Sequence, residues 1–267
     1  MNPSENLQEK LREKFKDYLI SLGDFSIFNW IAIRKVKTLW KRRGLFVKHC
    51  ESIGVSSLGI IVLSGAFMGG VLGYQLYESF AMFGAQALVG GSVGVALFRE
   101  MAPVFAAVMV IGRSGAAMAA EIATMRVSEQ VDALEVMAVD PMEYLVTPRI
   151  MAGFLMVPLL AMVFACVGSV ASAGVACGVM GLDGSIYWQQ FARWVDAEEM
   201  VHILLKSSVF GLCLSSIACF FGFYAQGGAG AVGRATRVTV VVSLLVVLMF
   251  DYILTSLLPY RTTMLKI

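Results

Sequence analysis

Hydrophobic and polar positions alternate along this chain in long blocks. Five blocks are almost free of charge, and each has the roughly 20 apolar residues that a helix needs to cross a bilayer. They cover residues 52–77, 84–112, 150–182, 201–226 and 238–259. The pattern therefore predicts an all-α polytopic membrane protein with five transmembrane helices.

A polar block, residues 113–149, separates the second and third of these spans. Apolar residues recur within it at helical spacing: Val127, Val131, Leu134 and Ala138. Acidic residues lie mostly off this stripe, and Asp140-Pro141 is expected to end the helix because a residue before proline is pushed out of the α region. We expect an amphipathic helix at the aqueous face, where another protein docks.

Residues 1–50 are basic and amphipathic. They hold eleven of the 21 Lys and Arg residues, interleaved with aromatic residues such as Trp30 and Trp40. Rings at the headgroup level and cations near anionic lipid are typical of a helix that lies in the membrane interface. We expect an interfacial region at 1–50, with no cleavable signal peptide, followed by a membrane domain at 51–260.

Composition and charge narrow the class further. The chain has 267 residues, of which 58% are hydrophobic and 15% charged, whereas a soluble domain is about 25% charged. A net charge of +2 gives no sign of nucleic-acid binding, and five cysteines without a CxxC pair and two distant histidines predict no metal site. Basic residues concentrate in 1–50, 113–149 and 227–237, so the positive-inside rule places the N-terminus and the 113–149 segment in the cytoplasm. We expect 227–237, which is rich in glycine, to form a turn.

Two further features of the spans predict how the helices pack. Gly65, Gly69 and Gly73 are spaced by four, which lets a neighbouring helix backbone approach closely. Four ionisable residues fall inside spans: Arg99, Glu100, Lys206 and Asp251. Each costs about 2.5–3.5 kcal/mol at a helix centre, so they should face the bundle interior or a wet cavity. Lys206 is expected to pair with Glu100 or Asp251, either as a polar lining and gate for an amphiphile or as a structural ion pair.

Motifs that the chain lacks also limit its function. It contains no GxxxxGK[ST] phosphate loop, no HExxH and no GxSxG, so we expect neither an enzyme nor a P-loop ATPase. A polar helix between spans, with no ATPase of its own, favours a permease moved by a separate subunit that binds ATP and magnesium. Two alternatives remain open: an ion-coupled secondary transporter of an amphiphile, and a membrane scaffold.

Several stretches together resemble the MlaE/YrbE family of permeases. They are SGAFMGGVLGYQ at 64–75, GRSGAA at 112–117, AEIATMRVSEQVDALEVM at 120–137 with Asp140-Pro141, and RATRVTVVVSLLVVLMFDYILTSLL at 234–258. The resemblance covers nearly all of residues 45–260 and is closest to the inner-membrane permease of the Mla phospholipid transport system, while residues 1–44 fit only in general character.

This resemblance implies a homodimeric ABC permease in the bacterial inner membrane. Its partners would be an MlaF-type ATPase, an MlaB-type STAS protein and an MlaD-type MCE hexamer in the periplasm. In the alternative scaffold role, the chain would only anchor the MCE ring. The permease would move glycerophospholipids between the inner membrane and periplasmic carriers, maintaining outer-membrane lipid asymmetry, without a cofactor of its own. The lipid cavity and its gating would use Arg99, Glu100, Lys206 and Asp251. Coupling to the ATPase would use Arg126, Glu129, Gln130, Asp132, Ala133, Leu134, Glu135 and Met137.

Overall fold

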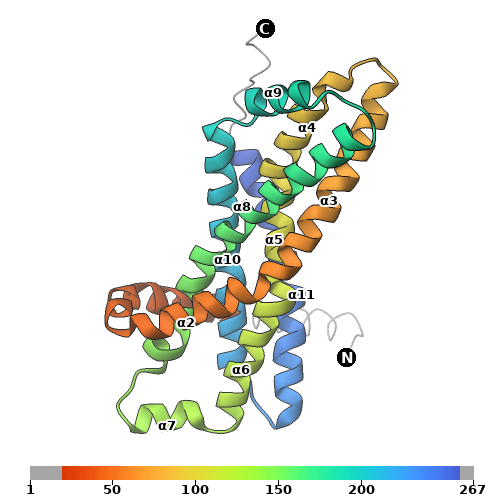
Figure 1. The fold of residues 1–267 in the computed structure, drawn as a ribbon. Coiled ribbons are helices and arrows are strands. Elements are labelled where there is room, and N and C mark those ends of the chain that lie inside the picture. Colours follow the sequence, from red (N-terminus) through yellow and green to blue (C-terminus); the bar gives the residue numbers. More distant parts are fainter. Residues whose placement is uncertain (1–19, 259–267) are drawn as a thin grey trace, which may run out of the picture.

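The computed structural model describes residues 20–258, except for the side chains of residues 40 and 41. The predictions made for residues 1–19, and for the side chain of Trp40, lie outside this part. Within residues 20–258 the secondary structure is helical and contains no strand (Figure 1). Residues 20–34 are helical and are followed, in order, by η1 (Lys35–Arg42), α2 (Arg43–Ile53), α3 (Val55–Ala81), η2 (Gln86–Leu88), α4 (Val89–Ala96), η3 (Leu97–Met101), α5 (Ala102–Val110), η4 (Ile111–Gly115), α6 (Ala116–Val127), α7 (Gln130–Val136), η5 (Met142–Val146), α8 (Thr147–Gly178), α9 (Gly184–Trp194), α10 (Ala197–Phe223) and α11 (Ala229–Leu257).

Five helical stretches of the described chain are long and apolar enough to cross a membrane. They run over Arg43–Ala81, Gln86–Val127, Met142–Gly178, Ala197–Phe223 and Ala229–Leu257. The predicted all-α class and the five spans are therefore confirmed. α7 and α9 lie at opposite ends of the bundle (Figure 1), and we call these the α7 end and the α9 end.

The second span is longer than predicted. Its helix does not stop near residue 112 but continues through η4 and α6 to Val127, a run of 42 residues that is about 60 Å long at 1.5 Å per residue. The run 113–127 contains no proline and five alanines, and alanine is the strongest helix former. Charges alone therefore do not interrupt it. The run begins with the short 3-10 helix η2, and the π-helical turns η3 and η4 lie further along it.

The turn predicted at 227–237 is shorter in the structure. Gly227 has a positive φ of 103°, which glycine adopts without strain, and α11 begins two residues later at Ala229. Arg234 and Arg237 consequently lie on the first turns of the fifth span rather than in a loop.

The glycine strip of α3 is a helix–helix seam, as predicted, and its partner is α8. A Cβ atom at Gly69 would lie 2.0 Å from the carbonyl oxygen of Gly168, and one at Gly73 would lie 2.6 Å from Ser172 Oγ. α4 uses glycines in the same way against α9, because a Cβ at Gly90 would lie 2.2 Å from the carbonyl oxygen of Tyr187. Bare backbone lets these helices touch directly, which drives packing in lipid.

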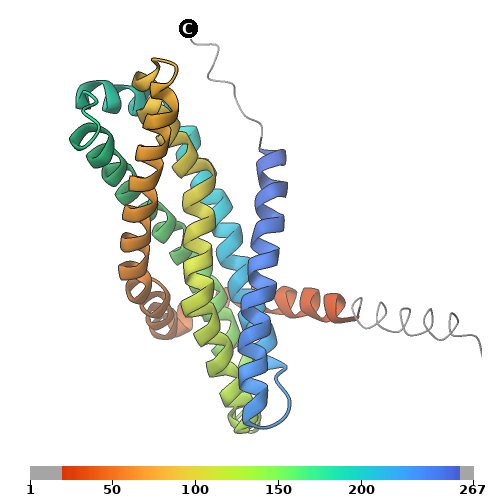
Figure 2. The same ribbon diagram turned by 90° about the vertical axis from the view of Figure 1, so that its right-hand side faces the viewer.

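The helix of residues 20–34 lies crosswise to the bundle and projects from its side (Figure 2). Phe28 is buried against the end of α10, with ring centroids 5.6 Å from Phe220 and 5.8 Å from Phe223. The other side of this helix exposes Ile27 and Trp30. This amphipathic placement is what the sequence of residues 20–34 predicts.

Candidate functional site

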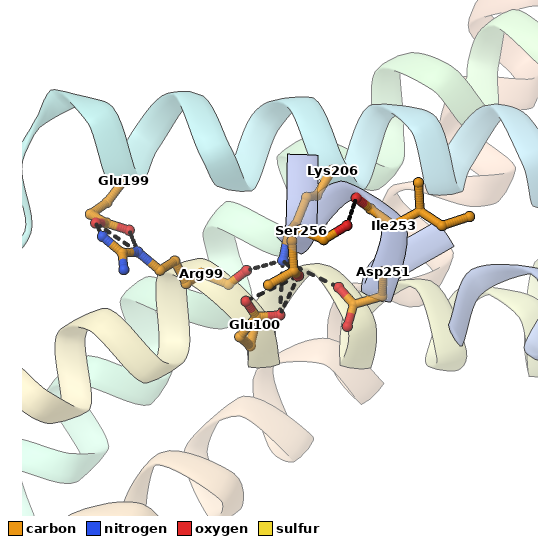
Figure 3. A network of polar contacts seen from close by, with 8 residues as sticks. Arg99, Glu100, Glu199, Lys206, Asp251, Ile253 and Ser256 are labelled. Atoms are coloured by element: carbon orange, nitrogen blue, oxygen red, sulfur yellow. Dashed lines mark hydrogen bonds and ion pairs between the residues drawn. The ribbon is translucent and has the colours of Figure 1, made fainter. Parts of the chain in front are cut away.

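Lys206 is the centre of a polar network inside the bundle (Figure 3). Its side chain is 1% exposed, and its ammonium donates to carboxylates from two other helices, Glu100 Oε2 at 2.8 Å and Asp251 Oδ1 at 3.3 Å. Thr255 Oγ1 at 2.7 Å and the carbonyl oxygen of Arg99 at 3.0 Å complete its surroundings. The predicted pairing of Lys206 is thus confirmed with both carboxylates rather than one, and it joins η3, α10 and α11.

Arg99 forms a second ion pair beside this network, with Glu199 of α10. Its Nε lies 2.9 Å from each carboxylate oxygen of Glu199, and its Nη2 also donates to Oε1. Such a forked pair is among the strongest charge-assisted arrangements. Arg99 and Glu100 are neighbours in sequence, yet they bond different residues of α10.

The π-helical turn η3 places these two side chains. Glu199 and Lys206 are seven residues apart on α10 and so share one face, separated by about 10 Å along the helix axis. A π turn holds an extra residue and often marks a functional position. Here it presents Arg99 to the first turn of α10 and Glu100 to a position two turns deeper.

Sequence reasoning missed Glu199. The predicted spans 150–182 and 201–226 leave residues 183–200 between them, whereas α10 already begins at Ala197, directly after α9. The available signal was Asp196 followed by two glutamates, because acidic residues are enriched at helix starts. Nothing in the sequence distinguishes Glu199, whose side chain is 4% exposed, from Glu198, whose side chain is 44% exposed.

The second candidate site is the turn at the α7 end, formed by residues 126–140 (Figure 1). α6 ends at Val127, Glu129 has a positive φ of 58°, and α7 covers only Gln130–Val136. The amphipathic helix predicted here is therefore short and is broken at Glu129. The side chain of Arg126 on α6 connects the two helices across this break, with its Nη1 2.5 Å from Asp132 Oδ1 on α7. Its guanidinium lies 5.8 Å from the centre of the Phe223 ring.

The predicted apolar stripe of this turn is correct at three of four positions. Val131 is buried, and Val127 and Leu134 are half-buried, against the end of α10 and neighbouring helices. Ala138 is exposed and lies beyond the helix with a φ of 57°, so its place in the stripe was wrong. The helical period cannot extend past a residue that leaves the helical conformation.

The outer surface of the turn holds most of the residues predicted to couple to an ATPase. Those exposed are Glu129, Gln130, Asp132, Ala133, Glu135 and Met137, while Arg126 and Leu134 are half-buried. Val136, which the sequence reasoning passed over, is 88% exposed and lies beside Met137 at 65%. An exposed apolar pair next to the exposed Glu135 is suited to a protein partner rather than to water.

Residues after α7 form a capped reverse turn that fixes this surface. The amide of Val139 donates to the carbonyl of Leu134 and that of Ala138 to Glu135, both at 2.9 Å, which is a Schellman motif with alanine in the place usually taken by glycine. The prediction that Asp140 ends α7 was wrong. Asp140 instead accepts a hydrogen bond from the Met142 amide at 2.9 Å and so caps the following helix, which has Pro141 in its first turn. Caps of this kind are typical of Asp followed by Pro.

We expect Ala138→Gly to slow hydrogen exchange at the amides of residues 130–139 by about fivefold. Glycine removes roughly 1 kcal/mol of left-handed strain, and that free energy corresponds to such a factor in the opening equilibrium. Hydrogen-exchange mass spectrometry measures it. Ala133→Gly, inside α7, is the matched control and should speed exchange by a similar factor because glycine weakens a helix interior; slower exchange in both variants would contradict the strain argument.

The basic segment after the crosswise helix binds the same region. Lys35 pairs with Asp140, and Arg42 Nε lies 3.2 Å from Glu143 Oε1 with its guanidinium over the ring of Tyr144. Thr147 Oγ1 donates to the carbonyl of Ala32 at 3.2 Å. The N-terminal segment therefore braces the start of α8 just after the turn at 126–140.

Comparisons with known proteins identify the family. The family model described as Permease MlaE matches residues 46–257. A probable ABC transporter permease protein of Rickettsia prowazekii is 36% identical over 239 residues, 89% of this chain and 92% of that protein. The intermembrane phospholipid transport system permease protein MlaE of Haemophilus influenzae is 34% identical over 94% of this chain and 97% of its own length.

A plant protein is also similar. The chloroplastic protein TRIGALACTOSYLDIACYLGLYCEROL 1 of Arabidopsis thaliana is 36% identical over 226 residues, 85% of this chain and 64% of that protein. The family model and the bacterial relatives each extend over nearly the whole membrane part of the sequence. The chain is therefore a multi-pass membrane protein that belongs to the MlaE family of ABC permeases.

Proposed function

We propose that this chain is the membrane subunit of an ATP-driven phospholipid transporter, and not itself an enzyme. One observation carries the proposal: a single helical run, Gln86–Val127, holds Arg99 and Glu100 in its membrane part and leads directly into the turn at 126–140. The two candidate sites thus lie on one helical rod, about 40 Å apart from Glu100 to Arg126 at 1.5 Å per residue.

A rod of this kind supports a mechanism for coupling. A separate ATPase that grips Val136 and Met137 and closes on ATP would displace α6, and with it the π-helical turn η3. Because η3 is bonded to Lys206 and Glu199, its displacement strains both ion pairs and shifts α10 relative to α11. Binding at one site then changes the free energy of the other, which is what allosteric coupling requires.

Arg99 supports the choice of phospholipid as the transported molecule, since a guanidinium binds phosphate in a forked geometry. We assign Arg99, Glu100, Lys206 and Asp251 to the lipid path and its gating. The relative in H. influenzae is named for intermembrane phospholipid transport. We extend that role to glycerophospholipid exchange between the inner membrane and periplasmic MCE carriers, which maintains outer-membrane asymmetry.

The proposal includes an orientation and a set of partners. The N-terminus and the turn at 126–140 are cytoplasmic, because basic residues concentrate at the α7 end. We propose a homodimer with an MlaF-type ATPase, an MlaB-type STAS protein and an MlaD-type MCE hexamer, with ATP and magnesium held by the ATPase. Residues 1–50 form the interfacial region, 51–260 the permease domain and 113–149 the coupling segment within it.

We expect Val136→Asp to reduce capture of the ATPase subunit by the tagged permease by at least tenfold. An aspartate there places a new charge in an apolar contact, which costs more than about 1.4 kcal/mol, a tenfold change in affinity. Val179→Asp is the matched control, since Val179 is 73% exposed but follows α8 near the α9 end; its ATPase recovery should equal wild type. Equal recovery with Val136→Asp would refute the coupling role of the turn.

A second candidate function is ion-coupled transport of an amphiphile. The observation that favours it is the sharing of one buried ammonium by Glu100 and Asp251, an arrangement that proton-coupled transporters use. Lipid transfer between proteoliposomes driven by a pH gradient without ATP would support it. Transfer that needs ATP and the ATPase subunit would support the ABC mechanism, and it would also exclude a scaffold that only anchors an MCE ring.

A further inference from the structure

We propose that Arg99 and Glu199 together recognise a zwitterionic phospholipid headgroup, and that Glu199 makes the site discriminate against net-anionic phospholipids. This inference rests on the proposed phospholipid transport and deepens it, because it names the lipid class. The guanidinium receives the phosphate and the carboxylate receives the amine. The two side chains are mutual partners here, so one internal pair is exchanged for two pairs with the headgroup.

The position of the pair suits a headgroup. Glu199 is the third residue of α10, one turn from the end of that span and close to where α9 leads into it. Arg99 keeps 17% of its side chain exposed while holding Glu199. Two turns deeper, Lys206 is only 1% exposed and faces four acceptors with its three protons. Of these two cations, Arg99 is therefore the one that a phosphate can reach.

The balance of charge favours a headgroup with no net charge. Among residues 20–258, the two linked ion-pair groups contain three carboxylates and two cations: Glu100, Glu199 and Asp251 with Arg99 and Lys206. With all five side chains ionised, this cluster has a net charge of −1. A phosphatidylglycerol headgroup finds no surplus positive charge there, whereas the amine of phosphatidylethanolamine meets the carboxylate of Glu199.

Glu198 provides a matched control on the same helical turn. Its side chain is 44% exposed, and its Oε1 lies 4.0 Å from Nε2 of His202. Glu198→Gln and Glu199→Gln remove the same charge one residue apart on α10. A difference between them in lipid preference therefore reports the carboxylate that bonds Arg99 and not the general charge at the start of the helix.

The experiment measures lipids that copurify with the full-length permease. The protein is reconstituted in vesicles with equal amounts of phosphatidylethanolamine and phosphatidylglycerol, re-extracted in detergent, and its lipids are quantified by mass spectrometry. We expect wild type and Glu198→Gln to enrich phosphatidylethanolamine about fivefold, the factor that corresponds to one ordinary net hydrogen bond. Glu199→Gln should lower this ratio to about one or reverse it, because Arg99 then lacks its internal carboxylate.

The outcomes separate this inference from the function on which it rests. Lipid recovery with the same ratio in wild type and Glu199→Gln overturns the role of Glu199 but leaves phospholipid transport standing. Recovery of neither lipid by wild type overturns both. If Glu199→Gln does not fold, the double variant Arg99→Gln with Glu199→Gln replaces it, since a neutral amide pair preserves the packing; it should show a ratio of about one, and a retained fivefold enrichment would overturn the inference.

Discussion

Replacing Gly69 with alanine is expected to destabilise the permease, whereas the same change at the adjacent Gly70 should leave it as stable as wild type or slightly more so. The added Cβ at position 69 would lie 2.0 Å from the carbonyl oxygen of Gly168, a backbone atom that cannot rotate away. At position 70 the nearest atom is Val175 Cγ2 at 3.6 Å, an ordinary contact.

The sizes of two opposing free-energy terms decide whether alanine stabilises or destabilises the protein at each position. Alanine gains about 1 kcal/mol over glycine in a helix interior, and this gain is unopposed at Gly70. At Gly69 the overlap must be relieved by separating α3 from α8, and overpacking of this kind costs typically 1–3 kcal/mol and sometimes more. The midpoint of thermal unfolding in detergent measures both variants, and a midpoint for Gly69→Ala at or above that of Gly70→Ala would show that the seam is not tight.

Sequence alone predicted the number and class of the spans because the bilayer imposes length and apolarity on each of them. It predicted the α3 seam for a similar reason, since glycines at four-residue spacing have few uses in a membrane helix other than close approach. It could not place the end of the second span. Polarity marks where a helix leaves the membrane, but helix propensity decides where it stops, and the alanine-rich run to Val127 continues regardless.

Some residues of the two candidate sites could likewise be identified from the sequence, and others could not. Arg99, Glu100, Lys206 and Asp251 were identifiable because ionisable residues inside spans are costly and need a reason. Glu199 was not, because its partner is 100 positions away in sequence and only the meeting of α10 with η3 distinguishes it from Glu198. The turn at 126–140 was recognisable from its stripe, whereas the break at Glu129 depends on a local backbone conformation that the stripe does not encode.

Substitution of Lys206 by methionine should cause the largest loss of stability among the polar residues of the described bundle. Two carboxylates, Glu100 and Asp251, would lose the ammonium that holds them. Removing one partner of a fully buried ion pair costs about 3–5 kcal/mol. Because the side chains of Glu100 and Asp251 are 38% and 22% exposed, we expect a smaller loss of about 2–3 kcal/mol, which lowers the unfolding midpoint of a chain of this size by roughly 5–10 °C. Thermal unfolding in detergent, followed by size-exclusion chromatography, measures the shift.

A triple variant separates a structural role of this network from a role in transport. Lys206→Met with Glu100→Gln and Asp251→Asn removes every charge around the ammonium position while keeping similar volumes, and neutral replacement of a buried ion network is often tolerated. We expect it to regain most of the lost stability. If the network is a gate strained through η3, the triple variant should still fail to transfer phospholipid in the presence of ATP and its ATPase partner. Wild-type transfer by a stable triple variant would reduce the network to a structural tie between η3, α10 and α11.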